Sequence, residues 1–151
     1  MMKPQRKAYA HVPPSVDRKP SEVTDSYWIY AERKTGFYPS ATENVGKWLV
    51  FVPLCQIDEV WQKIKVATQK GKLGNATKAA TARPNPLAAR PDSKVICVYT
   101  YDWTDEADVR RIRQELRKLG ITSRIPYKTD KDTLAGKYAS KGYKRIYKYL
   151  E

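Results

Sequence analysis

The apolar positions of the chain are most regular between residues 93 and 120. Residues 94–101 are apolar on both alternating faces of an extended chain, with the sequence Lys-Val-Ile-Cys-Val-Tyr-Thr-Tyr. A strand with one solvated face would alternate apolar with polar residues, so this pattern predicts a central strand covered on both sides.

The segment that follows, residues 104–119, has the period of an amphipathic helix. Val109, Ile112, Leu116 and Leu119 fall on one face at helical spacing. Three of the four arginines of this segment fall on a neighbouring face that we expect to be solvated: Arg110, Arg113 and Arg117. We expect Thr104 to cap the first turn and Gly120 to end the helix, as such residues commonly do.

A second amphipathic helix is predicted from Ile57 to near Gly71. Val60, Trp61 and Ile64 follow Ile57 at helical spacing, which places Trp61 in the core. Further strands are predicted at residues 26–31, 46–52, 75–83, 123–128 and 142–150. Residues 34–43, 83–93 and 129–140 are predicted as loops, the last with at most one helical turn.

Two of these strands have an open alternative. Alanine favours a helix in residues 75–83, whereas the short length between Gly74 and Pro84 fits a strand of small residues, which we predict. A strand of small side chains leaves room for a ligand above the sheet. Residues 142–150 place Tyr143, Arg145, Tyr147 and Tyr149 on one alternating face, which favours a terminal strand, although a helix is the alternative.

These elements predict an α+β domain: a sheet with helices on its convex face and a functional concave face. We assign the domain to residues 26–151. Residues 1–25 contain four prolines among charged and small residues. This composition predicts a flexible proline-rich leader or an extended arm held against the domain.

Charge points to an anionic partner. The net charge is +13, and residues 1–25 account for only +2 of it, with five basic and three acidic residues. The folded body therefore carries +11 and would attract RNA, DNA, a phosphorylated ligand or an anionic membrane surface. The alternative is a domain whose surface is basic without a specific partner.

Several classes of protein and site are not predicted. Cys55 and Cys97 lack the spacing of a zinc site, and we expect both to be buried free thiols in a reducing cytoplasm. The longest nearly apolar run, residues 48–55, is too short to span a bilayer, so no membrane partner is predicted. Nucleotide-loop, dinucleotide, metalloprotease and hydrolase motifs are absent, and we predict no cofactor.

The candidate ligand site combines basic and aromatic residues from different predicted strands. Lysine contacts phosphate as a compact charge on a long stem, while aromatic faces stack on bases with little sequence preference. We expect Lys78 and Lys128 to form a two-point phosphate clamp on the concave face. The complete set of predicted ligand-binding residues is Lys78, Arg83, Tyr99, Trp103, Tyr127 and Lys128. The alternative is a solvated basic face with tyrosines packed at its edge.

The four tryptophans also raise a comparison with cap binding, in which two indoles enclose a methylated base. Trp61 and Trp48 lie in apolar segments, so we predict that they belong to the core. Trp28 and Trp103 are the freer candidates. No pair at cap-binding spacing is evident in the sequence.

Five blocks of sequence, taken together, resemble the family of the basophilic-leukaemia-expressed protein. They are Gly-Lys-Trp-Leu-Val-Phe-Val-Pro, Ile-Asp-Glu-Val-Trp, Gly-Lys-Leu-Gly, Val-Ile-Cys-Val-Tyr-Thr and Tyr-Lys-Thr-Asp, at residues 46–53, 57–61, 71–74, 95–100 and 127–130. The resemblance spans residues 46–138. It implies a fold like that of the cap-binding translation initiation factor 4E, a curved antiparallel sheet backed by helices.

The same family is sometimes labelled a phosphothreonine lyase. Bacterial effectors with that chemistry use a histidine acid, a lysine base and arginines that clamp phosphate. The sole histidine here is His11, in the proline-rich leader, so we do not transfer the activity. No catalytic residue is assigned.

Three functional hypotheses follow. The leading one is a small cytoplasmic domain that binds RNA or another phosphate-bearing ligand on the concave sheet face. The second is an enzyme that acts on a phosphorylated substrate with a lysine as base. The third is a protein-interaction module for an acidic partner.

Overall fold

The computed structural model describes residues 17–86, 92–134 and 147–151. Its centre is an antiparallel sheet of six strands in the order β1-β3-β4-β2-β5-β6. The strands are β1 (Trp28–Glu32), β2 (Gly46–Pro53), β3 (Ala76–Ala80), β4 (Ser93–Thr100), β5 (Pro126–Thr129) and β6 (Tyr149–Leu150). The strand predicted from small residues is therefore formed, as β3. The central position expected for residues 94–101 is confirmed, since β4 lies between β3 and β2.

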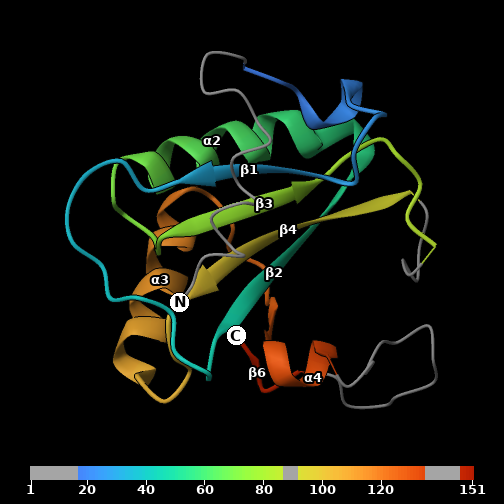
Figure 1. Ribbon diagram of the computed structural model, residues 1–151. Helices are drawn as coiled ribbons and strands as arrows, with labels where there is room; N and C mark the ends of the chain where they lie inside the picture. The colour runs from blue at the N-terminus through green and yellow to red at the C-terminus, as the bar shows by residue number, and fades with distance from the viewer. Residues whose placement is uncertain (1–16, 87–91, 135–146) are drawn as a thin grey trace.

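Two long helices cover one face of the curved sheet, as Figure 1 shows, and the α+β prediction is confirmed. They are α2 (Ile57–Gln69) and α3 (Glu106–Lys118); the described part also contains a short α4 (Asp130–Leu134) and the 3-10 turns η1 (Pro20–Glu22) and η2 (Leu54–Gln56). The predicted cap of α3 is wrong by one residue. Asp105 caps the helix by accepting the Asp108 N–H at 3.2 Å, because the Thr104 hydroxyl instead donates to Asp102.

Strand register separates two faces of the sheet. Trp48 pairs with Val98 on one side and with Tyr127 on the other, and all three are fully buried beneath the helices. The Trp48 indole N–H donates to the Val109 carbonyl of α3 at 3.0 Å. Because successive residues of a strand point to opposite faces, Lys47 and its neighbours in register face away from α2 and α3.

Apolar residues of α2 and α3 fill the core between helices and sheet. Ile64 and Ile112 are fully buried, and Trp61 keeps 2% of its surface exposed, as the helical spacing predicted. Burial of such side chains contributes about 1.5–3 kcal/mol each relative to exposure. This layer fixes the positions of β3, β4 and β2, which carry the candidate site on their other face.

Two expectations about side-chain exposure are wrong. Arg113, expected on a solvated face, is fully buried, because its guanidinium donates to three main-chain carbonyls at the end of α3 and near the C-terminus. Cys55 is exposed because it lies in η2, which contributes no buried residue to the core, whereas Cys97 is buried in β4.

The chain before β1 packs against the domain from residue 17 onward. Pro20 and Val23, which belong to the expected leader, are buried, and Val23 joins the core. Residues 1–16, including His11, lie outside the described residues. Residues 142–146, the first part of the predicted last strand, also lie outside the described residues. The end of that predicted strand forms β6, Tyr149–Leu150.

Candidate phosphate-binding site

Three lysines meet on the sheet face that is turned away from α2 and α3. Lys47 of β2 lies opposite Tyr99 of β4 and Lys128 of β5, and Lys78 of β3 lies opposite Cys97 of β4. We call Lys47, Lys78 and Lys128 the lysine cluster. The cluster combines one side chain from each of three strands that are distant in the sequence.

Lys78 is held by aromatic rings. Its ammonium nitrogen lies 3.9 Å from the centroid of the Trp28 ring and 5.9 Å from that of Tyr99. No oxygen of the described residues forms an ion pair or a hydrogen bond with this nitrogen. Burial lowers the pKa of Lys78 below its ordinary value, with the charge of Lys47 acting in the same direction. Lys78 is therefore a partly desolvated cation without a counter-ion in the described part of the chain.

Lys47 has a counter-ion. It is 6% exposed, and its ammonium donates to Asp130 at 2.8 Å and to Thr133 at 2.7 Å, both in α4. Helix α4 is held at this place because the Asp130 N–H also donates to the Val45 carbonyl just before β2. Asp130 therefore compensates one positive charge of the lysine cluster and links it to α4.

Lys128 is the most deeply buried lysine of the cluster, with 4% of its surface exposed. Burial lowers the pKa of Lys128, and the charge of Lys47 lowers it further, while Asp132 opposes the shift. Beneath the lysines, burial raises the pKa of the Cys97 thiol, which keeps this group neutral. The positive charges thus face no thiolate, and Lys78 remains a cation without a counter-ion in the described residues.

Half of the predicted ligand-binding residues come together here. Lys78, Tyr99 and Lys128 belong to the cluster or its walls. Arg83 does not: it is exposed beyond the end of β3, where its guanidinium lies 4.4 Å from the Tyr27 ring centroid and donates to the Asp25 carbonyl.

The other two predicted residues face elsewhere. Tyr127 is fully buried on the helix-covered face, where its ring packs edge-on against Trp48 and its hydroxyl shares a hydrogen bond with Thr100. It has no surface for a ligand to stack on, which corrects its assignment. Trp103 packs against the core, and the Lys148 ammonium lies 4.1 Å from its ring centroid.

Two residues of the site were not among those predicted. Lys47 lies in a strand of otherwise apolar side chains, and a lysine in such a strand is a signal that a polar face is needed. Trp28 was a candidate only for base stacking, not as a partner of Lys78. Neither role is visible without the register, because β1, β3, β2 and β5 meet only in the folded sheet.

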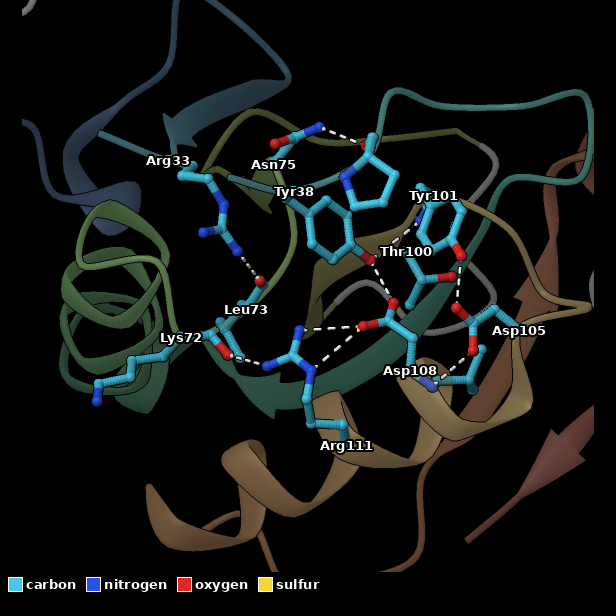
Figure 2. Close-up of polar contacts among 12 residues, drawn as sticks. Arg33, Tyr38, Lys72, Leu73, Asn75, Thr100, Tyr101, Asp105, Asp108 and Arg111 are labelled. Carbon is cyan, nitrogen blue, oxygen red and sulfur yellow. Dashed lines mark hydrogen bonds and ion pairs between the residues drawn. The ribbon is translucent and has the colours of Figure 1, made fainter. Parts of the chain in front are cut away.

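A second polar cluster holds the long β1–β2 loop against α3 (Figure 2). The Tyr38 hydroxyl donates to Asp108 at 2.5 Å and accepts the Tyr101 N–H at 3.2 Å. Arg111 binds the same carboxylate and donates to the Lys72 carbonyl. Burial, followed by the hydrogen bond to Asp108, raises the pKa of Tyr38. The Tyr38 hydroxyl and the Arg111 guanidinium thus both donate to the Asp108 carboxylate. This cluster has a structural role, and we call it the tie.

Close packing beside this tie positions Tyr99. A side chain on Gly74 would place its Cβ 2.3 Å from the Tyr99 carbonyl oxygen. Glycine is therefore required for this close approach of the α2–β3 turn to β4. The turn thereby supports the strand that carries one aromatic wall of the lysine cluster.

The family described as "Basophilic leukemia-expressed protein Bles03" matches residues 40–134, more than half of the chain. The chain belongs to the Bles03 family. The matched residues include β2 to β5, and thus Lys47, Lys78 and Lys128. The resemblance inferred from the five sequence blocks is therefore confirmed.

Solved structures confirm the expected fold. A schistosome eIF4E complexed with m7GpppA and 4E-BP has a TM-score of 0.65 and 15% sequence identity, and the match covers 99% of this chain and 81% of that one. A C. elegans eIF4E-3, in complex with the 4E-binding protein Mextli and a cap analogue, has a TM-score of 0.55 and 19% identity, with 89% and 77% covered. The Bles03-family chain thus has an eIF4E-like fold.

None of the helices in the described residues has both the length and the apolar character needed to cross a bilayer. Nor do these residues bring three or more histidine, cysteine, aspartate or glutamate side chains together in a way that could hold a metal ion.

Proposed function

We propose that this Bles03-family chain binds a phosphate-bearing ligand, single-stranded RNA in the first instance, at the lysine cluster. The observation that carries the proposal is Lys78, whose ammonium is partly desolvated, lies against two aromatic rings and has no counter-ion in the described residues. A phosphate oxygen would supply the missing acceptor, and a charge-assisted hydrogen bond of this kind is roughly twice as strong as a neutral one.

The surroundings of Lys78 support a nucleotide rather than a bare anion. Trp28 and Tyr99 are partly exposed aromatic residues beside the ammonium, and stacking of a base on such a ring contributes about 1–3 kcal/mol. Lys128 offers a second cation across the sheet. The schistosome eIF4E of the same fold is complexed with m7GpppA, a ligand that joins nucleosides through phosphates. The net charge of +13 would steer such ligands towards the protein.

The proposal is tested with three single-site variants. Lys78→Met and Lys128→Met each remove one proposed phosphate contact while keeping a long apolar side chain. Lys118→Met is the matched control, because Lys118 lies on α3, is largely exposed and pairs with Glu115. Binding of a short single-stranded RNA is measured by fluorescence anisotropy at several salt concentrations.

Both cluster variants should weaken binding for all RNA sequences and reduce the slope of log affinity against log salt by about one. Lys118→Met should leave affinity and slope unchanged. Equal effects of the three variants would mean that diffuse charge, not the cluster, binds RNA. Absence of binding by the wild-type chain would exclude RNA as the ligand.

The lowered pKa of Lys78 favours a second candidate, an enzyme acting on a phosphorylated substrate with Lys78 as base. A lysine whose pKa is lowered by burial is better able to accept a proton near neutral pH. Release of inorganic phosphate from a phosphothreonine peptide would support this function if Lys78→Met abolished it. An acidic protein partner that binds without turnover would support the interaction-module hypothesis instead.

A further inference from the structure

The chain before β1 is fastened to α2 by a serine. The Ser21 N–H donates to one oxygen of Asp58 at 2.9 Å, and the Ser21 hydroxyl donates to the other at 2.5 Å. We call residues 17–23 the strap. Its outer end is held by an ion pair between Asp17 and Lys65 of α2.

The strap covers part of the core. Pro20 and Val23 are buried, and the Pro20 carbonyl accepts the Ala82 N–H at 3.0 Å beyond the end of β3. Pro20 and Trp61 line the same shallow hollow, next to Asp58. The strap therefore contributes to the cover that leaves only 2% of Trp61 exposed.

We propose that Ser21 is a phosphorylation site and that its phosphorylation releases the strap from α2. A basophilic protein kinase, that is, a kinase that selects serines preceded by basic residues, would transfer the γ-phosphoryl group of a nucleoside triphosphate to the Ser21 oxygen. The bond from that oxygen to phosphorus forms, the bond from the γ-phosphorus to the nucleoside diphosphate breaks, and the hydroxyl proton leaves to the kinase. The site is separate from the lysine cluster, and the inference does not depend on the proposed function.

Electrostatic repulsion determines whether phosphorylation of Ser21 tightens the strap on α2 or releases it. Phosphorylation removes the hydroxyl donor and places a charge of about −1.5 to −2 against the Asp58 carboxylate. Glu59 adds a second carboxylate in the first turn of α2, so the positive end of that helix is already compensated. On the strap itself, Arg18 is paired with Asp25 at 2.8 Å. Lys19, the other basic residue of the strap, is exposed to solvent.

The sequence around Ser21 suits recognition by a basophilic kinase. Arg18 and Lys19 precede the serine by three and two residues. Kinases discriminate among substrates by such charge patterns. Ser21 is partly exposed and lies in a turn of only three residues, so local opening can present it to an enzyme.

The test uses the full chain with phosphoserine incorporated at position 21. Amide hydrogen exchange, followed by mass spectrometry, compares the peptide over residues 17–25 with peptides from β2 and β4. Repulsion between two charges at contact distance predicts that phosphorylation speeds exchange of the strap by about tenfold or more. Peptides from β2 and β4 should be unchanged.

Asp58→Asn provides the matched control, because the asparagine oxygen still accepts a hydrogen bond but carries no charge. Phosphoserine in this background should leave the strap protected. Unchanged protection in the phosphorylated wild-type chain would overturn the inference. An equal rise in exchange in the Asp58→Asn background would do so as well, since the Asp58 charge would then not be responsible.

The modification step is tested by treating the wild-type chain with a basophilic serine/threonine kinase and ATP. Mass spectrometry should find phosphate on Ser21, at a level that Arg18→Ala reduces several-fold. Phosphate placed only elsewhere, or equal labelling of Ser21 in both proteins, would contradict the assignment of the kinase class.

Discussion

Replacing Arg113 with methionine tests whether its hydrogen bonds hold the C-terminal part of the sheet on α3. Arg113 is fully buried and donates to the carbonyls of Glu151 at 2.9 Å, Ile121 at 2.9 Å and Ser123 at 2.8 Å. Methionine has a similar length but no donor. The Arg113 guanidinium carbon also lies 5.9 Å from the Trp48 ring centroid. The substitution therefore leaves three carbonyl groups without their charged partner while keeping a side chain of similar length beside Trp48.

The magnitude follows from two opposing terms. Hydrogen bonds to charged groups contribute about 1.5–3 kcal/mol each. Removal of the guanidinium also recovers a desolvation penalty of several kcal/mol. Ser123 is exposed, so water can reach at least one of the freed carbonyls. The net loss for Arg113→Met should therefore be about 3 kcal/mol, the lower end of the range for breaking a buried charged network.

Urea unfolding, followed by tryptophan fluorescence, measures this loss as a lower midpoint with an unchanged slope. Arg117→Met is the matched control on the same helix. The Arg117 side chain is partly exposed and forms no hydrogen bond or ion pair within the described residues, so this change should cost less than about 0.5 kcal/mol. Arg113→Lys should fall between the two. A stability of Arg113→Met close to that of Arg117→Met would refute the assigned role.

Three further predictions concern the core, the tie at the β1–β2 loop and acid stability. Trp61→Ala should lower the free energy of unfolding by about 3–5 kcal/mol, and a denaturant midpoint near that of the wild type would mean that Trp61 is not a core residue. Tyr38→Phe should cost about 1–2 kcal/mol because the Asp108 carboxylate loses a buried donor, and calorimetry would detect the lower Tm. The hydrogen bond from Thr104 lowers the pKa of Asp102 below its ordinary value of 3.8. The ionised Asp102 carboxylate therefore makes its full contribution to stability above pH 3.8, and this contribution is lost as pH falls through the folded-state pKa of Asp102. Asp102→Asn should flatten the acid limb of an unfolding titration.

Local patterns were sufficient for most of the elements. The apolar runs of β2 and β4 and the helical spacing of Val109, Ile112 and Leu116 depend on residues close in sequence. The same reasoning misplaced Arg113, because the carbonyls that it binds come from residues 121, 123 and 151. Helical periodicity identifies the face on which a side chain lies, but it does not identify distant acceptors that make burial favourable.

The candidate site was less accessible to sequence reasoning. Lys78, Tyr99 and Lys128 were predicted from their chemistry, but their proximity depends on strand register, which is non-local. Lys47 joins them because it lies opposite both Tyr99 and Lys128. Tyr127 was assigned to the same face as Lys128, but the two residues are adjacent in β5 and successive residues of a strand point to opposite faces. A shift of one residue exchanges the two faces of a strand.

Burial of the lysine stems has a consequence for the entropy of binding. A surface lysine loses rotational freedom when it grips an anion, and ordering such a side chain costs about 0.5–1.5 kcal/mol. Lys47 and Lys128 are at most 6% exposed, and Lys78 rests on Trp28, so much of this freedom is already lost on folding. An anion that reaches the Lys78 ammonium would meet a pre-organised cation, and its affinity would exceed that expected from the same charge on a mobile side chain.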